Sequence, residues 1–450
     1  MELNIIQRVY LIGIGGIGMS GLARYFNKRG CKVSGYDRTE TPLTISLIDE
    51  GIHITYNDLA NELPAEYKIA EKTTLIIYTP AIPKDSDILN FFKNNNFELK
   101  KRSEVLGIIS RSMFTIAVAG THGKTTTSSM VAHILKHSGF DCSAFLGGIA
   151  TNYATNVLFG DNNVVVVEAD EYDRSFLALH PDIAIVTSMD ADHLDIYGDE
   201  SHLTESFKLF VSQVKPGGKL LCPEGLDLQK AVTYSGTSDA DVTAQNIRIQ
   251  NGEFYFDFNS SLVNIKDIKL GLPGLHNVEN ALAAIQAALI VGVESSKIKD
   301  ALATYQGVKR RFEYIVKTEK HIYIDDYAHH PEELRACISA VKSLYPNKKL
   351  TTIFQPHLFT RTRDFASGFS EVLGMSDNLI MLDIYPAREL PIEGVTSKII
   401  LNDVALEKKR ICSMQEALNY VEKERPELLL TVGAGDIDTL IEPLKKILSQ

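Results

Sequence analysis

Short apolar runs alternate with amphipathic stretches along most of the chain. The runs occur at residues 9–14, 32–36, 74–78, 114–119, 164–167, 183–187, 321–324, 350–354, 379–382 and 428–432. Stretches with apolar residues at helical spacing follow several of these runs, for example at residues 20–28 and after Pro331. This strand–helix–strand rhythm predicts mostly parallel sheets, and runs without a polar interruption are typical of strands that helices cover on both faces.

The pattern restarts twice, which predicts three α/β domains. A chain of 450 residues also exceeds what one hydrophobic core usually supports. We expect a Rossmann-like N-terminal domain at 1–110, a central P-loop ATPase-like domain with a mostly parallel sheet at 111–307, and a Rossmann-like C-terminal domain at 308–450. The polar, basic stretch at 100–111 is expected to join the first two domains.

The formal charge of -11 and the cysteine pattern argue against several kinds of partner and site. Nucleic acids and anionic membranes require a basic surface, so neither is expected as a partner. The five cysteines include no Cys-x-x-Cys pair, which argues against a disulfide framework and a zinc site. No basic leader precedes the first apolar run, and no run approaches the roughly 20 apolar residues of a membrane span. We therefore expect a cytoplasmic protein.

A glycine-rich segment between a predicted strand and a predicted helix is the strongest local signal. It consists of Gly120, Thr121, His122, Gly123, Lys124, Thr125 and Thr126. Backbone N–H groups at a helix start bind phosphate oxygens, Lys124 adds charge, and Thr125 is the candidate ligand for Mg²⁺. Val118 stands where the common phosphate loop has its first glycine, so the loop is a variant form. The alternative is a purely structural turn.

Acidic residues close the next two predicted strands. Glu168 follows the run at 164–167, while Asp190 and His193 follow the run at 183–187. The carboxyl ends of parallel strands form the ligand crevice of such sheets, so both clusters are expected to face the phosphate loop. We predict Glu168 as a ligand of Mg²⁺, or of Mn²⁺ in its place. His193 is a further candidate ligand, or else a histidine that orients a water or caps a helix.

The N-terminal glycines resemble a dinucleotide-binding fingerprint. Gly13, Gly15, Gly16 and Gly18 follow the first strand, and Asp37 follows the second. Such a loop binds a diphosphate and its acid binds a ribose. On this spacing alone, NAD and a UDP-sugar are equally acceptable, and an NAD-dependent dehydrogenase is one alternative.

Two polar clusters in the last third are candidates for substrate chemistry. Asp326, Tyr327 and His329 lie between a strand end and a helix start, where a histidine accepts a proton, binds an anion or simply caps the helix. Arg361 and Arg363 either bind a carboxylate or solvate a helix face.

Taken together, these segments resemble the Mur ligase family over essentially the whole chain. The loop at 120–125 matches the family's Gly-Thr-x-Gly-Lys-Thr form, residues 276–284 resemble its adenine segment, and 326–331 resemble its Asp-Tyr-Gly-His-His-Pro segment. The resemblance implies that the N-terminal fingerprint binds the UDP part of UDP-N-acetylmuramate. It also implies an ATP site that includes His276, Asn280, Arg311 and Asp326, and an amino-acid site that includes Tyr327, His329 and Arg361.

The resemblance implies an ATP- and Mg²⁺-dependent ligase that joins L-alanine to the lactyl carboxylate of UDP-N-acetylmuramate through an acyl phosphate, in peptidoglycan synthesis. Lys124, Glu168, His193, His329 and Arg361 are then the catalytic candidates, with His329 as the base. Addition of a recycled murein peptide is the first alternative, and a module that only hydrolyses ATP is a more distant one. We expect a monomer or a weak homodimer.

Later-acting family members carry a carbamylated lysine on the helix after the Asp-x-His segment. Lys208 lies at about that distance from His193, but a shift of one residue places Phe207 there instead. We therefore expect Lys208 to be unmodified.

Overall fold

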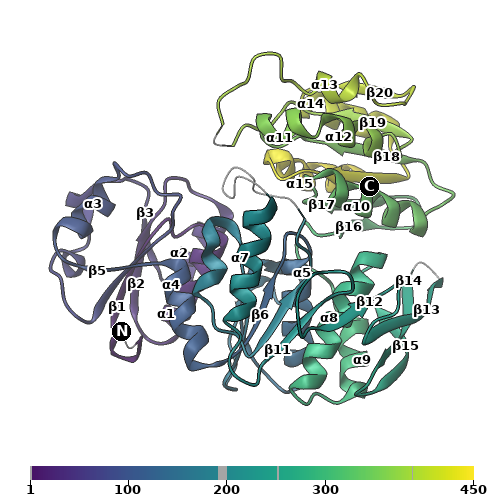
Figure 1. Ribbon diagram of the computed structural model, residues 1–450. Coiled ribbons are helices and arrows are strands. Elements are labelled where there is room, and N and C mark those ends of the chain that lie inside the picture. The colour runs from purple at the N-terminus through teal and green to yellow at the C-terminus, as the bar shows by residue number, and fades with distance from the viewer. Residues whose placement is uncertain (1–2, 191–199, 251–252, 388, 450) are drawn as a thin grey trace. The chain divides into compact units, whose positions relative to one another are not determined.

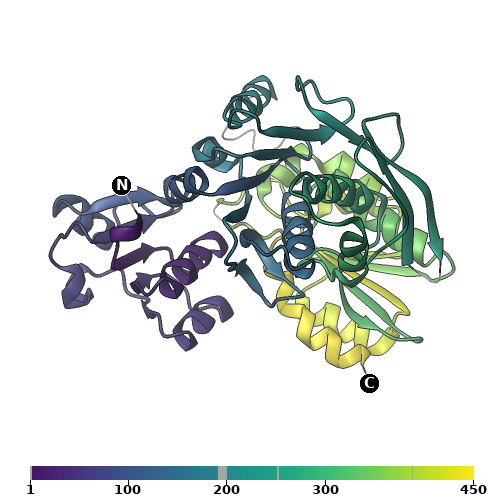
Figure 2. The same ribbon diagram turned by 90° about the horizontal axis from the view of Figure 1, so that it is seen from below.

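The computed structural model describes residues 3–190, 200–250, 253–387 and 389–449. Within these residues the strands form three sheets of five, ten and six strands. Each sheet is made by a consecutive part of the chain, as the colours of Figures 1 and 2 show. The predicted α/β class with three domains is thereby confirmed. By proximity, the chain divides into one compact unit of Met1–Ala244, Phe258–Ile265 and Glu279–Leu302, and another of Gln245–Asp257, Lys266–Val278 and Ala303–Gln450.

The first sheet is parallel and has the strand order β3-β2-β1-β4-β5. Its strands are β1 (Arg8–Ile12), β2 (Lys32–Tyr36), β3 (His53–Thr55), β4 (Thr74–Tyr78) and β5 (Glu98–Lys101). Its helices are α1 (Ile17–Lys28), α2 (Pro42–Asp49), α3 (Asp87–Asn94) and α4 (Arg102–Ser112). The order reverses beside β1, and ligands bind outside the carboxyl ends of strands at such a switch point. The glycine fingerprint, which begins directly after β1, is therefore placed where a nucleotide would bind.

The predicted joining segment at 100–111 does lead from the first sheet toward the central one, but as regular secondary structure. These residues complete β5 and form α4, whose side chains Val105, Leu106 and Ile109 are buried. Their spacing of one, three and four residues creates an apolar helix face despite the surrounding charges. When polarity is averaged over residues 100–111, the basic residues at the start of this helix mask its apolar face.

The central sheet has ten strands in the order β15-β14-β13-β12-β11-β10-β6-β9-β7-β8. They are β6 (Phe114–Ala119), β7 (Ser143–Ala150), β8 (Thr155–Leu158), β9 (Val164–Glu168), β10 (Ile183–Val186), β11 (Lys219–Pro223), β12 (Val232–Ser235), β13 (Val242–Gln250), β14 (Glu253–Ser260) and β15 (Asn264–Leu270). Its helices include α5 (Lys124–His137), α7 (Glu200–Ser212), α8 (Leu275–Ile290) and α9 (Ser295–Thr304). The run from β13 to β7 that contains β6 is parallel, whereas β8 pairs antiparallel with β7.

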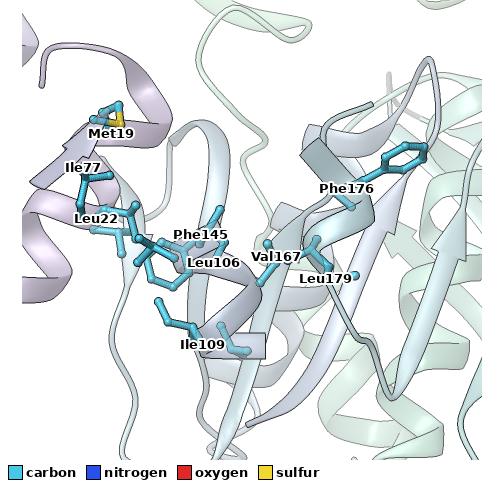
Figure 3. Packing of buried hydrophobic residues seen from close by; sticks show 14 of the residues in the cluster. Met19, Leu22, Ile77, Leu106, Ile109, Phe145, Val167, Phe176 and Leu179 are labelled. Atoms are coloured by element: carbon cyan, nitrogen blue, oxygen red, sulfur yellow. The ribbon is translucent and has the colours of Figure 1, made fainter. Parts of the chain in front are cut away.

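The first and central sheets share one hydrophobic core. It includes Met19 and Leu22 of α1, Leu106 of α4, and Phe145 of β7, and Figure 3 shows these side chains as part of a single cluster. A buried amide reinforces the contact, since Asn156 of β8 accepts a hydrogen bond from Arg24 at 2.7 Å and donates to the hydroxyl oxygen of Ser20 at 3.2 Å. The first sheet is therefore fixed to the edge of the central one.

The third sheet has the order β16-β17-β21-β18-β19-β20, and only β16 pairs antiparallel with its neighbour. Its strands are β16 (Glu313–Lys317), β17 (Ile322–Asp326), β18 (Leu350–Phe354), β19 (Asn378–Met381), β20 (Lys409–Ile411) and β21 (Leu428–Val432). Its helices are α10 (Pro331–Leu344), α11 (Phe359–Asp364), α12 (Ala366–Leu373), α13 (Lys398–Leu401), α14 (Met414–Glu424) and α15 (Ile441–Leu448). In the described part of the chain, no helix is long and apolar enough to cross a membrane.

A buried histidine on α5 should make folding sensitive to pH. The Nδ1 and Nε2 atoms of His133 lie 2.9 Å from the hydroxyl oxygen of Tyr153 and 3.0 Å from the carbonyl oxygen of Ala301. Burial lowers the pKa of His133 to about 4. The unfolded chain, with a histidine pKa of about 6.5, therefore binds the proton first as the pH falls. The contribution of His133 to the free energy of unfolding is fully present above about pH 6.5. It declines as the pH falls toward 4, by up to roughly 3 kcal/mol.

Denaturant unfolding of the wild type and of His133→Gln between pH 4 and 7.5 tests this dependence. Other titrating groups contribute to both proteins, so the difference between the two curves isolates His133. We expect the wild-type free energy of unfolding to rise more steeply between pH 4.5 and 6.5 than that of the variant, with a slope that approaches one additional proton. Parallel curves would contradict the assignment.

Candidate active site

The glycine-rich loop joins β6 to α5, as predicted. Gly123 caps the helix in the left-handed region at φ 79°, a conformation that favours glycine. The amide of His122 donates to the hydroxyl oxygen of Ser188 at 2.8 Å, and the hydroxyl of Thr121 lies 2.8 Å from the same atom. The loop is thus braced by the residues after β10, and the start of α5 has the position that binds phosphate in such loops.

Lys124, the first residue of α5, lies across this loop. Its Nζ donates to the carbonyl of Gly120 at 2.6 Å and to Oε1 of Glu171 at 2.8 Å. Burial lowers the pKa of Lys124, but the carboxylates of Glu171 and its neighbours raise it more, so the net shift is upward. The lysine therefore remains a cation at neutral pH. Glu171 was not predicted as its partner; the run of acids after β9 was the available signal.

Glu168 and Thr125 form an oxygen pair beside the loop. The Thr125 hydroxyl donates to Oε1 of Glu168 at 2.9 Å, and the backbone amide of Gly147 donates to Oε2 at 2.8 Å. Burial raises the pKa of Glu168, against the lowering effect of Lys124. A hydroxyl and a carboxylate are the donors that Mg²⁺ prefers, and nucleotide sites complete its shell with water and phosphate. The two residues therefore fit the predicted ion.

The remaining metal prediction concerns His193, which lies outside the described residues. Asp190 is described, and its backbone amide donates to the Thr121 hydroxyl at 3.0 Å. Within the described ranges, no group of three or more His, Cys, Asp or Glu side chains is arranged to hold a metal ion.

Helix α8 carries the two residues predicted near adenine. Oδ1 of Asn280 accepts a hydrogen bond from Thr127 at 3.1 Å, and a Cβ at Gly123 would lie 2.8 Å from the same oxygen. Asn280 thus supports the phosphate loop. Burial lowers the pKa of His276 to about 4, so its imidazole is neutral at physiological pH. The adenine roles of both residues remain predictions.

The N-terminal fingerprint forms a tight loop around Asp37. The amide of Gly15 donates to Oδ2 of Asp37 at 2.7 Å, and a Cβ at Gly15 would lie 2.8 Å from that oxygen. Gly16 is the N-cap of α1. At Gly18, an added Cβ would overlap the guanidinium of Arg102. The predicted glycines and acid are thus brought together, and Arg102 joins them from outside the fingerprint.

In the third sheet, two arginines stack on the ring of a tyrosine that directly follows β17. The guanidinium groups of Arg310 and Arg311 lie 5.3 and 5.2 Å from the ring centre of Tyr327. Arg310 also forms an ion pair with buried Asp325, with its Nε 3.0 Å from Oδ2. The stacking orients both guanidinium groups, and the ion pair fixes Arg310 further.

Asp326 is held by the backbone rather than by side chains. Its Oδ2 accepts from the amide of Phe312 and its Oδ1 from the amide of Ala328, both at 2.7 Å. Each oxygen keeps a second acceptor position. A contact to an ATP ribose, as the resemblance implies, therefore remains a prediction.

The two neighbouring histidines have different roles. His330 is the N-cap of α10, where its Nδ1 accepts from the amide of Glu332 at 3.4 Å. In His329, Nδ1 lies 3.0 Å from the carbonyl oxygen of Tyr327 and 3.3 Å from Oε2 of Glu333. Because both neighbours are acceptors, Nδ1 carries the hydrogen of the neutral ring and Nε2 keeps the lone pair. Burial lowers the pKa of His329. The helix-capping alternative therefore applies to His330, and His329 has the properties of a base.

The two arginines of α11 also differ. Arg361 is close enough to His329 for its charge to contribute to the lowered pKa of that ring. Arg363 is half exposed and pairs with Asp364, with Nε 2.7 Å from Oδ1. Of the two candidates, Arg361 lies beside the predicted base and Arg363 belongs to the surface.

Comparison with known proteins assigns the family. Three family models match consecutive parts of the chain: "Mur ligase family, catalytic domain" at residues 8–113, "Mur ligase middle domain" at 118–288 and "Mur ligase, glutamate ligase domain" at 310–435. The UDP-N-acetylmuramate–L-alanine ligase of Flavobacterium psychrophilum is 50% identical over 450 residues and is covered completely, as is this chain. The chain belongs to the Mur ligase family. The glycine fingerprint is therefore not that of an NAD-dependent dehydrogenase.

Other Mur ligases agree with this assignment. The UDP-N-acetylmuramate–L-alanine ligase of Cytophaga hutchinsonii is 48% identical, with 100% of this chain and 98% of that protein covered. The crystal structure of UDP-N-acetylmuramate-alanine ligase from Thermotoga maritima is 27% identical, has a TM-score of 0.82 and covers 98% of each chain. A murein peptide ligase from Psychrobacter arcticus, at 23% identity and a TM-score of 0.70, shares the fold.

Phe207 and Lys208, the two candidates for the position of the modified lysine, face different surroundings on α7 (Glu200–Ser212). Phe207 of α7 is fully buried, with its ring centre 5.3 Å from that of Phe176. Lys208 is half exposed, and its Nζ lies 2.9 Å from Oδ2 of Asp227. Phe207 thus points to the interior and Lys208 to solvent, and the unmodified state of Lys208 remains a prediction.

Proposed function

We propose that this Mur ligase joins L-alanine to the lactyl carboxylate of UDP-N-acetylmuramate with ATP, giving UDP-N-acetylmuramoyl-L-alanine, ADP and phosphate in cytoplasmic peptidoglycan synthesis. Full-length identity of 50% with a ligase of that name carries this proposal. The phosphate loop supports it, because Lys124 and the Thr125–Glu168 oxygen pair form an arrangement suited to phosphoryl transfer.

The first step must overcome repulsion between two anions. The lactyl carboxylate attacks the γ-phosphorus of ATP, and ADP leaves with the electrons of the broken bond. Lys124 places a permanent cation beside the phosphate loop, and the amides at the start of α5 donate to the phosphate oxygens. Bound at Thr125 and Glu168, Mg²⁺ would supply further positive charge for the developing transition state. The product is an acyl phosphate.

The second step requires a neutral amine. The nitrogen of L-alanine attacks the activated carbonyl, and phosphate leaves as the amide forms. We assign removal of the amine proton to Nε2 of His329, whose lone pair is kept in place by the contacts of Nδ1. Arg361 is assigned to the alanine carboxylate, for which a planar guanidinium offers two parallel donors.

A substrate panel tests the proposed function. Phosphate release is measured with ATP, Mg²⁺ and UDP-N-acetylmuramate against L-alanine, L-serine, glycine and a murein tripeptide, with mass spectrometry of each product. We expect the highest kcat/KM for L-alanine, about tenfold above glycine, because one methyl group gives only modest discrimination. Preference for the tripeptide would indicate the recycling reaction. Phosphate release that ignores UDP-N-acetylmuramate would indicate an ATP-hydrolysing module.

A further inference from the structure

Arg102 occupies a position between the glycine fingerprint and the oxygen pair of Glu168 and Thr125. It is the first residue of α4, yet its side chain reaches the first turn of α1 at Gly18. A Cβ at Gly18 would overlap the guanidinium group, so the glycine leaves room for an arginine that lies 84 residues further along the chain. The last glycine of the fingerprint therefore makes space for the Arg102 side chain, a role that the spacing of the motif does not reveal.

The other side of the same guanidinium faces the acidic segment after β9. Its Nη2 lies 3.4 Å from Oδ2 of Asp170, two residues beyond Glu168. Arg102 and Glu168 line the same small cleft, together with Asp170. The arginine side chain is 23% exposed, so part of it remains open to a ligand. One side chain thus connects the start of α1 with the edge of the phosphoryl-transfer site.

A diphosphate at the glycine fingerprint requires a cation that the fingerprint itself does not provide. The segment 13–20 reads Gly-Ile-Gly-Gly-Ile-Gly-Met-Ser and contains no basic residue. Backbone amides and the dipole of α1 offset part of the ligand's charge. A guanidinium provides the remaining charge and a planar pair of donors for phosphate oxygens. Its long contact with Asp170 leaves these donors able to reorient.

We propose that Arg102 binds the sugar-side phosphate of the UDP-sugar and thereby orients the sugar's lactyl acid toward Glu168. This assignment rests on the proposed function, because it requires a UDP-sugar at the fingerprint. Arg102 contacts the diphosphate, whereas Lys124 is the cation that lies across the phosphate loop and is assigned to ATP. It therefore governs the affinity for the sugar nucleotide.

Measuring ligand binding to the Arg102→Met variant shows whether Arg102 contacts the sugar-side phosphate, the other phosphate or the lactyl acid. Methionine retains most of the side-chain volume and removes the charge. The matched control is Arg111→Met, at the exposed end of the same helix. Calorimetry uses three ligands: UDP-N-acetylmuramate, UDP-N-acetylglucosamine, which lacks the lactyl acid, and UMP, which lacks the sugar-side phosphate.

We expect Arg102→Met to weaken both UDP-sugars by about 10- to 100-fold, the range for loss of a charge-assisted hydrogen bond, and to leave UMP unchanged. In turnover assays, KM for UDP-N-acetylmuramate should rise while KM for ATP stays constant. Arg102→Lys should recover part of the affinity, and Arg111→Met should match the wild type. Thermal unfolding of all three variants verifies that they are folded.

Two results would overturn the assignment. Unchanged affinity for both UDP-sugars in Arg102→Met would remove Arg102 from the diphosphate site. A loss confined to UDP-N-acetylmuramate would assign the arginine to the lactyl acid instead. If the wild-type protein binds neither UDP-sugar, the proposed function itself fails, which distinguishes that failure from the failure of Arg102 alone.

Discussion

Replacement of Lys124 by methionine should lower kcat by about a thousandfold or more, the largest loss expected of any single substitution in the described site. The lysine is the cation that lies across the phosphate loop, and its raised pKa keeps it charged throughout the neutral range. Without it, the negative charge that develops during attack on the γ-phosphate lacks its fixed protein counter-charge. Phosphate release at saturating ATP, UDP-N-acetylmuramate and L-alanine measures the loss.

The control for Lys124 follows from its partner. Glu171 is fully buried, so the single substitution also leaves a carboxylate without its ion pair to Lys124 and should destabilise the fold by about 3 kcal/mol or more. The double variant Lys124→Met/Glu171→Gln removes both charges and should recover most of the stability without recovering turnover. Recovered turnover in the double variant would show that the loss was structural rather than electrostatic.

Replacement of His329 by glutamine should lower kcat by about 10²- to 10³-fold. The imidazole acts in its neutral form, and burial moves its pKa below the ordinary value. In the wild type, kcat should therefore have an acidic limb that lies below the ordinary histidine pKa of about 6.5, and it should be level above that pH. The variant should lose this acidic limb together with the rate, because glutamine does not titrate. A pH profile of kcat from 5 to 8.5, at saturating L-alanine, measures both effects.

The neighbouring histidine provides the matched control. His330 caps α10, and asparagine is a good N-cap residue, so His330→Asn should preserve both the helix and the pH profile. Equal turnover of His329→Gln and the wild type at saturating L-alanine would require another base, with the departing phosphate the next candidate.

Several strands were predictable from short runs that are mostly apolar, although β2 also contains lysine, serine and glycine. β2, β4, β6, β18 and β21 match their predicted limits. The central sheet was underestimated, since β7, β8 and β11 to β15 were not predicted. In β14, Phe254, Phe256 and Phe258 are buried and alternate with polar residues, which is the period-two pattern of a half-covered strand. That signal was present, whereas the polar face of β13 gave little indication.

Sequence motifs located the site residues but not all of their contacts. The loop, Lys124, Thr125 and Glu168 were predicted and lie together in the structure. Glu171 and Arg102 were missed, because their roles depend on strand order and on a helix that the composition concealed. Motif spacing describes neighbours along the chain, whereas these contacts join segments about 50 to 80 residues apart.

The core shared by the first two sheets has a consequence for how the enzyme is divided. If residues 1–113 were expressed alone, Tyr25 of α1 would lose its contact with the ring of Phe145, and apolar side chains of the shared core would be exposed to water. The boundary between these sheets is therefore a packed hydrophobic interface rather than a hinge. If the sugar nucleotide binds at the fingerprint and ATP at the phosphate loop, as proposed, one compact unit of the chain carries both binding loops.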